Sequence, residues 1–216
     1  MTFKNNSEAH AIVGKLSEPS KMPCFAFSIP AWYCIIGAML HAIANSVCAE
    51  CYALKNRFIF GVVKAAMERR YAALMRALTD NAFRLEFKAA FKHLLRNESY
   101  FRWHDSGDLQ SIAHLVLLAE IAIENPHVQF WLPTRERNIV LGFLKINAVP
   151  ANLTIRVSAP MVDGKPLPMG IFPTSTVHKD GAVHGALCEA YTRGGKCGDC
   201  RLCWDKTVQN VSYPFH

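Results

Sequence analysis

The feature that most constrains the fold is the regular spacing of three short segments with the composition of β-strands. They cover residues 100–104, 127–132 and 152–158, and their centres lie about 28 and 25 residues apart. Parallel strands need a crossover of a dozen or more residues, usually an α-helix. Residues 112–124 and 138–146 have helical patterns and fill the two intervals. The spacing therefore predicts an α/β fold with parallel strands, and we expect a partial parallel (β/α) barrel-like arrangement.

The chain is expected to form a single domain, since 216 residues are enough to bury one core. Residues 1–23 are polar and are expected to be an extended lead-in. Residues 24–158 form the predicted α/β core. Residues 159–216 are expected to be an irregular C-terminal segment, because 159–186 alone contain four of the eleven prolines.

Two further helices and one strand are predicted before residue 100. Residues 24–30 have the pattern of a short first strand that stops at a proline. Apolar residues recur at helical spacing over 58–78 and again over 80–95, where Asp80 is a plausible N-cap. The phenylalanine stripe of the second helix is interpreted as core and not as a cofactor site.

Eight cysteines, seven of them in two groups, give the chain its clearest chemical signal. The first thiol group is Cys34 with the C-x2-C pair Cys48 and Cys51. The second thiol group ends in C-x2-C-x2-C and consists of Cys188, Cys197, Cys200 and Cys203. Two intervening residues allow neighbouring thiolates to turn toward one ion or cluster. Soft thiolates select zinc or iron–sulfur clusters over hard cations.

The two groups differ in the kind of site they can complete. Four thiolates can close a structural zinc site or fully ligate a four-iron cluster. Three thiolates leave one position open for a substrate, a water or another protein ligand, and Cys24 is the spare cysteine that could fill it. The spacing of the cysteines does not separate zinc from iron, nor does it fix the nuclearity of a cluster.

The N-terminal residues, the longest apolar segment and the net charge limit the compartments and partners that we expect for the protein. The first residues carry no signal-peptide pattern, so we expect a cytoplasmic protein in which cysteine groups bind metal more often than they form disulfides. The apolar residues 31–49 are interrupted by His41 and Asn45, which predicts a buried loop and helix and no membrane partner. A net charge of +7 is compatible with a nucleic acid or another anionic partner, and equally with basic helix faces. The oligomeric state stays open.

Polar side chains gather where the predicted strands end, which is where parallel α/β folds place their active sites. Loop residues at such edges carry function more often than core residues do. The alternative is structural, with a satisfied turn at 105–108 and arginines that bridge carboxylates. On the functional interpretation the catalytic candidates are His104, Asp105, Asp108 and Arg135, and the cofactor-binding candidates are Ser106, Gly107, Thr134, Arg156 and Ser158.

The order of these motifs resembles the phage "gene product 88" family. The resemblance covers about residues 28–205. A proline usually follows the first cysteine in that family, whereas Ile35 stands here. The resemblance implies a phage or prophage origin, hence the cytoplasm of a bacterial host, and an iron–sulfur site, but no established reaction. The matching elements are Cys34, residues 48–53 and 101–108, Thr134 with Arg135, residues 152–158, and the second thiol group through Trp204.

The layout is also similar to a reduced radical-SAM barrel. Those enzymes carry a three-cysteine loop after the first strand, bind a four-iron cluster with one open iron, and chelate S-adenosylmethionine there. Cys48 and Cys51 match the second half of their C-x3-C-x2-C motif, while thirteen residues in place of three separate Cys34 from Cys48. Residues 106–108 follow the second strand, where those enzymes hold a glycine-rich loop. By this resemblance the second thiol group would hold an auxiliary cluster.

Three hypotheses follow for function. The leading one is an iron–sulfur protein with one or two clusters of the 4Fe-4S type, and a radical-SAM-like reaction on a small-molecule or anionic substrate if it is an enzyme. The alternative is a zinc- or cluster-stabilised module that binds nucleic acid or a host protein. A third makes the clusters redox sensors or electron carriers.

Overall fold

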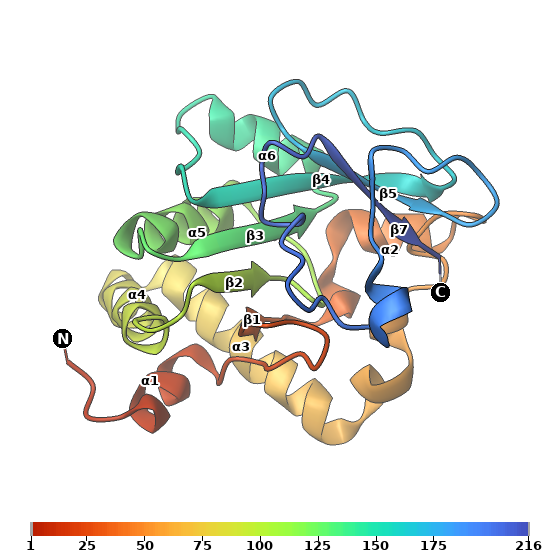
Figure 1. Cartoon of the computed structure of the whole chain (residues 1–216). Helices are drawn as coiled ribbons and strands as arrows, with labels where there is room; N and C mark the ends of the chain where they lie inside the picture. The colour runs from red at the N-terminus through yellow and green to blue at the C-terminus, as the bar shows by residue number, and fades with distance from the viewer. Residues whose placement is uncertain (1, 216) are drawn as a thin grey trace.

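A computed structural model describes residues 2–215, and its centre is one open sheet of seven parallel strands (Figure 1). All six strand pairings are parallel, which confirms the α/β interpretation. The predicted strands at 100–104, 127–132 and 152–158 correspond to the second, third and fourth strands. In spatial order the strands are β1 (Ala26–Phe27), β2 (Tyr100–Trp103), β3 (Gln129–Thr134), β4 (Leu153–Val162), β5 (Thr174–His178), β7 (Asn210–Pro214) and β6 (Ala186–Leu187).

The sheet does not close, so the expected barrel-like arrangement is not confirmed. Strands β1 and β6 form the two edges, and each pairs with a single neighbour among the described strands. Each edge strand is only two residues long. Closing a sheet into a barrel requires the edge strands to pair with each other through a matched register, and strands this short offer few backbone groups for that pairing.

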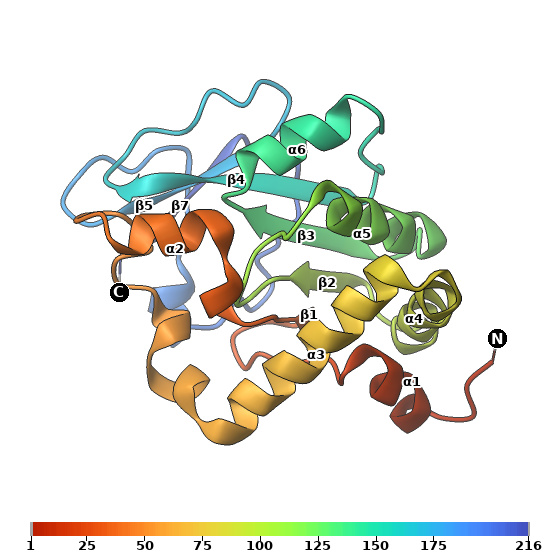
Figure 2. The same ribbon diagram turned by 180° about the vertical axis from the view of Figure 1, so that it is seen from behind.

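The helices lie on one face of the sheet, as the view from behind shows (Figure 2). The N-cap predicted at Asp80 is confirmed, because its side chain accepts a hydrogen bond from the backbone N–H of Phe83. Side chains from both layers form the core, in which Phe27, Phe91 and Trp103 are fully buried. None of the described helices is long and apolar enough to cross a membrane. The α-helices are α1 (Asn6–Val13), α2 (Ile35–His41), α3 (Gly61–Thr79), α4 (Asn81–Leu94), α5 (Ile112–Glu124) and α6 (Arg137–Leu144).

Two segments are more regular than the sequence indicated. The expected extended lead-in contains helix α1, which begins after the Asn5 cap and ends at Gly14 in the left-handed conformation (φ 78°). The C-terminal segment predicted to be irregular contains strands β5, β6 and β7 as well as the end of β4. Strand β5 has the polar sequence TSTVH, so it lacks the apolar run from which a buried parallel strand is normally recognised.

The second face of the sheet is covered by the C-terminal segment, residues 188–209. Figure 1 shows this segment in blue, running in front of β2 and β3 with the helices behind. The side chains that point toward it are polar or aromatic, and they alternate along each strand with the core residues. Trp131 and Arg156 are examples, at 4% and 0% exposure. The sheet is therefore sealed by helices on one side and by the second cysteine segment on the other.

Candidate functional site

The first thiol group lies at the carboxyl edge of the sheet, just beyond β1. The chain leaves β1, makes a short 3-10 turn, and reaches Cys34 as the residue before helix α2. Burial raises the pKa of the Cys34 thiol, and Asp108, Cys51 and Cys48 raise it further by their proximity. The structure therefore brings the three sequence-predicted thiols of this group together. A protonated thiol must lose its proton before it can bind a metal.

Gly37, in the first turn of α2, clears the space between two of these thiols. A Cβ atom on this residue would lie 2.8 Å from the Cys34 Cβ, 3.6 Å from its Sγ and 3.9 Å from the Cys48 Sγ. Any side chain here would enter the volume that both sulfurs face. Sequence reasoning missed Gly37. The signal available was its position between the first two cysteines, three residues after Cys34.

Asp108, which follows β2, forms hydrogen bonds to the end of β3 beside the first thiol group. Its carboxylate accepts hydrogen bonds from the backbone N–H of Leu109 (2.7 Å), the Thr134 hydroxyl (2.6 Å) and the backbone N–H of Arg135 (2.8 Å). Burial raises the pKa of Asp108, and those three donors oppose the rise. Asp108 was expected to act in catalysis, but its carboxylate accepts three hydrogen bonds from groups of the protein itself. It therefore positions Thr134 and Arg135.

Glu136 is a second buried carboxylate at this edge, which the sequence did not single out. It accepts a hydrogen bond from the backbone N–H of Ile36 in the first turn of α2 (2.8 Å). Burial raises its pKa, and the nearby Asp108 raises it further. The contact fixes the start of α2, and with it Cys34, against the end of β3. Asp108 and Glu136 together make the surroundings of Cys34 acidic.

Arg135 and Ser158 line the neighbouring strand ends. The Arg135 Nη1 donates to the carbonyl oxygen of Ala159 on β4 (2.6 Å). Burial raises the pKa of Cys48, and Arg135, the largest opposing influence, lowers it. Ser158 accepts a hydrogen bond from the Ser175 hydroxyl (2.9 Å). Of the candidate cations, Arg135 is the one that lies at a thiol of the first group.

The turn at 105–108 supports the first group mainly through its backbone. The Tyr52 hydroxyl, one residue after Cys51, donates to the backbone oxygen of Asp105 (2.5 Å), and the Asp105 carboxylate accepts from Ser28. Gly107 adopts a φ of 82°, and a Cβ there would lie 2.3 Å from Ile29 Cγ1 and 2.7 Å from its carbonyl oxygen. Close packing against the end of β1 explains this glycine without a bound cofactor. Ser106 is buried, and its hydroxyl has no hydrogen-bond partner among residues 2–215.

His104 is paired with a second buried histidine, His114. Its ring lies 5.2 Å from that of His114 on α5, in an edge-on arrangement. His104 is 3% exposed and has a left-handed φ of 52°. Neither of its ring nitrogens has a hydrogen-bond partner within the described chain. Burial lowers the pKa of His104, and it lowers the pKa of His114 to about 3, so both rings are neutral near pH 7.

The second thiol group lies over the second face of the sheet. Cys188 follows β6, and its N–H donates to the carbonyl of Ser212 on β7 (2.9 Å). The Cys203 Sγ lies 3.1 Å from the Tyr213 hydroxyl, and burial raises the pKa of Cys203 to about 12. Cys188 and Cys200 both raise the pKa of Cys197 by proximity. The four predicted members are therefore neighbours in the folded chain.

Arg156 organises the loop that carries these cysteines. This residue is fully buried, and its guanidinium donates to four backbone carbonyls at 2.9–3.1 Å. The carbonyls belong to residues on β5, within the cysteine run, and in the loop between that run and β7. The position expected to contact a cofactor therefore serves as an internal scaffold of the second group. The accepting residues are Thr174, Val208, Leu202 and Asp205.

Cys24, expected as the spare ligand of the first group, lies with the second. It shares a buried cluster with Cys203, Trp131 and Trp204. Burial raises its pKa to about 12, and Cys197 contributes to the rise. The error has a simple cause: β1 separates Cys24 from Cys34, so the two residues leave opposite ends of the same strand.

Arg102 is a further residue that sequence reasoning missed. Its guanidinium lies 4.5 Å from the centre of the Trp131 ring and 3.5 Å from the Met22 sulfur. It is close enough to Cys24, Cys197 and Cys203 to lower the pKa of each. The alternation of side chains along residues 100–103 could have identified it, because residue 102 must point away from the core that the helices cover.

The arrangement of the cysteine thiols decides which kind of metal centre they could hold. All eight cysteines are free thiols. Within residues 2–215, no three or more His, Cys, Asp or Glu side chains are already arranged to hold a metal ion. A zinc ion at about 2.3 Å from each sulfur would require the thiols to converge tightly, whereas a cluster holds its cysteines further apart. The donor types suit zinc or a thiolate-ligated cluster, and Gly37 leaves the space beside Cys34 and Cys48 free of a side chain.

Comparisons with known proteins agree with the motif order. The model of a protein family described as gene product 88 matches residues 1–206, nearly the whole chain. No curated protein and no solved structure matches the chain. Both thiol groups and strands β1 to β6 fall within the matched residues, whereas β7 lies beyond them.

Proposed function

The chain belongs to the gene product 88 family, and from this premise we propose that it is an iron–sulfur protein of phage or prophage origin. In this proposal the first thiol group binds a cluster with one iron not ligated by a cysteine. The second thiol group binds a further cluster that holds residues 188–209 against the sheet. Zinc in the second group is the alternative.

The observation that carries the proposal is the cleared volume at Gly37. The sulfurs of Cys34 and Cys48 lie within 4 Å of the position that a Cβ atom on Gly37 would take, and Cys51 is near enough to Cys34 to raise its pKa. Helices without a packing or functional need rarely keep glycine in their interior, since it costs about 1 kcal/mol relative to alanine. A cluster explains why both the glycine and the three thiols are there.

The residues around the first group support binding of a small polar molecule at the open position. An iron with a free coordination site can bind a donor atom of a substrate and exchange an electron with it. Arg135 supplies positive charge next to Cys48, and Asp108 holds Arg135 in place through its backbone N–H. We propose S-adenosylmethionine as the first molecule to test, with Arg135 pairing with its carboxylate.

The test is iron and acid-labile sulfide analysis on protein purified without oxygen. We expect iron and sulfide in equal amounts, and we expect Cys48→Ala and Cys51→Ala each to remove the first cluster and retain the second. Cys200→Ala is the matched control, which should do the reverse. Zinc without sulfide in the unmodified protein, or full iron in Cys48→Ala, would overturn the assignment.

Binding of the small molecule is tested separately. The reduced protein should change its electron paramagnetic resonance spectrum when S-adenosylmethionine is added, and Arg135→Met should weaken that response by about tenfold, as expected for one charge-assisted contact. A spectrum that does not respond would remove the radical-SAM-like reaction and leave the cluster assignment in place.

A second candidate function, binding of single-stranded nucleic acid, is favoured by one surface. The segment 31–49, expected to be buried, is substantially exposed, and with the start of α3 it presents large apolar side chains. Trp32, Tyr52 and Phe60 are 36%, 49% and 58% exposed. Arg57 and Lys64 stand among them, with the Lys64 amine 5.8 Å from the Trp32 ring. Aromatic rings interleaved with cations suit unpaired bases and phosphates.

This second candidate predicts salt-dependent binding of a labelled oligothymidine, measured by fluorescence anisotropy. Tyr52→Ala and Arg57→Ala should each weaken binding, while Lys165→Ala, a lysine outside this surface, should not. If the affinity for the oligothymidine changed neither with salt concentration nor with these substitutions, this surface would be excluded as a nucleic-acid site.

A further inference from the structure

Cys24 lies beside the four cysteines of the second thiol group, which gives this face of the sheet one sulfur more than a tetrahedral site uses. Cys24 comes from the segment before β1, more than 160 residues away in the sequence. The two segments are joined by a hydrogen bond from the N–H of Cys197 to the carbonyl of Lys21 (2.9 Å). Cys24 and Cys203 also pack in the same buried cluster. Five thiols therefore gather at this face of the sheet.

Two hydrogen-bond donors in the same place have no partner. The indole N–H of Trp131, a residue 4% exposed, is buried in the cluster that contains Cys24 and Cys203. The Arg102 Nε, whose guanidinium lies over the Trp131 ring, is also buried and unpaired among the described residues. A buried N–H without an acceptor costs about 1–3 kcal/mol. Anionic sulfur is an acceptor that would satisfy both donors.

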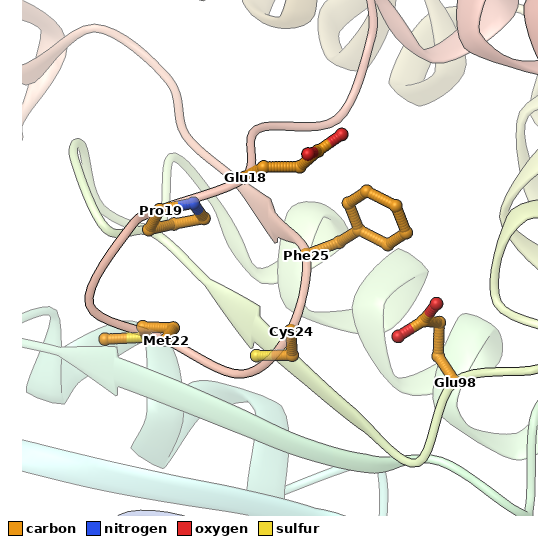
Figure 3. Close-up of a pocket in the computed structure, with 6 residues that line it drawn as sticks. All are labelled: Glu18, Pro19, Met22, Cys24, Phe25 and Glu98. Atoms are coloured by element: carbon orange, nitrogen blue, oxygen red, sulfur yellow. The ribbon is translucent and has the colours of Figure 1, made fainter. Parts of the chain in front are cut away.

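Cys24 is also next to the solvent. Cys24 lines a pocket of about 260 Å³ together with Met22, Phe25, Glu18 and Glu98. Figure 3 draws these residues as sticks. The Cys24 sulfur points to the side on which Met22 lies, and both carboxylates stand at the pocket wall. The pocket leaves one side of Cys24 open to small reagents, although this thiol is mostly buried.

We propose that Cys24 is an alternative fourth ligand to Cys188 in the second thiol group. The run of Cys197, Cys200 and Cys203 supplies three thiolates from one loop. Cys24 and Cys188 are the two remaining thiols, they come from different segments, and both neighbour Cys197. A zinc ion or a four-iron cluster takes four cysteines, so one of the pair is ligated while the other is free to exchange with it.

This inference rests on the proposed function only in requiring that the second group binds a metal. The experiment uses the full chain with Cys48→Ala and Cys51→Ala, so that remaining metal belongs to the second group. In this background we expect Cys24→Ser and Cys188→Ser each to keep more than about half of the iron, or of the zinc. The double variant, and the control Cys200→Ser, should keep less than about a tenth.

A second readout follows the Cys24 sulfur directly. In the Cys188→Ser variant, metal should protect Cys24 from iodoacetamide, and a chelator should restore its labelling, measured by mass spectrometry. Loss of metal from Cys188→Ser as complete as from Cys200→Ser, with Cys24 labelled before chelation, would show that Cys24 is not a ligand. A background protein with no metal at all would overturn both this inference and the second site of the proposed function.

Discussion

The two thiol groups differ in their electrostatic surroundings. Around the first, Asp108 and Glu136 raise the pKa of Cys34 in addition to the effect of burial. Around the second, Arg102 lowers the pKa of Cys197 and Cys203 against the effect of burial, and other arginines act in the same sense. Cations stabilise a complex of several thiolates, whereas carboxylates oppose it.

The groups also differ in how firmly their loops are held. Arg156 fastens the second loop through four buried carbonyls, and Trp204 fastens it through a hydrogen bond to Phe101 (2.9 Å). Helix α2, which follows Cys34, leaves Met39 65% exposed. The difference indicates a structural role for the second group and a reactive or binding role for the first.

The largest expected effect comes from disrupting the proposed metal site of the second thiol group. Cys197→Ser should lower the melting temperature by roughly 10 °C or more. The reason is that a metal bound only in the folded state adds its binding free energy to the free energy of unfolding, and residues 188–209 depend on it for their place against the sheet. Cys51→Ser, the matched change in the first group, should shift the melting temperature by only a few degrees. Thermal unfolding followed by circular dichroism measures both. Equal shifts in the two variants would erase the proposed distinction.

Arg156 tests the same contrast without touching a cysteine. Arg156→Met should reduce the free energy of unfolding by about 3 kcal/mol, since four buried carbonyls lose their donor. Arg135→Met, in which one backbone contact is lost, should cost about 1 kcal/mol. Urea titration gives both values. A smaller loss in Arg156→Met than in Arg135→Met would contradict the scaffold role.

The third prediction concerns the loss of folding stability at acidic pH that the buried histidine pair at the end of β2 should cause. His114 has a folded pKa of about 3 against 6.5 in the unfolded chain, so the unfolded state takes up protons first as the pH falls below 6.5. Stability is therefore present above pH 6.5 and declines toward pH 3, by about 2 kcal/mol at pH 5. Urea titrations at pH 7.5 and 5 of the wild type and His114→Gln measure it. The substitution should remove that part of the decline, and an unchanged pH profile would argue against a buried neutral His114.

The smallest effect on stability is expected at Gly37. In Gly37→Ala the usual helical gain of about 1 kcal/mol is offset by the contact with Cys34, so the melting temperature should hardly move. Iron at the first group should nevertheless fall, because the new methyl group occupies the cleared space. Iron analysis after anaerobic purification gives the answer. Gly142→Ala, another helical glycine, is the control and should retain the iron.

Sequence patterns were sufficient for the part of the fold built from regular repetition. Residues 112–124 form α5 with the predicted bounds, and Phe83, Phe87 and Phe91 are buried along α4 as their spacing indicated. The spacing of the central strands gave their parallel order. Such patterns are recognisable because each helix or strand must bury one side.

Contacts between distant segments were beyond the reach of the sequence. Strand β5 was missed because its side chains are mostly polar and its hydrogen-bond partners lie on distant strands. Arg156 was expected to meet a ligand, yet its partners lie 18 to 52 residues further along the chain. Cys24 was considered as a spare ligand of the first group, but it lies with the second, because β1 carries the chain from one end of the sheet to the other between Cys24 and Cys34.

The four carbonyls held by Arg156 also set an order of events during synthesis. The arginine emerges from the ribosome with β4, and the last of its partners, Val208, follows 52 residues later. Until then a charged side chain on a central strand has no complete set of acceptors, and the second face of the sheet has no cover. Shortened chains that end before residue 208 are therefore expected to expose this face and to be early targets for proteases.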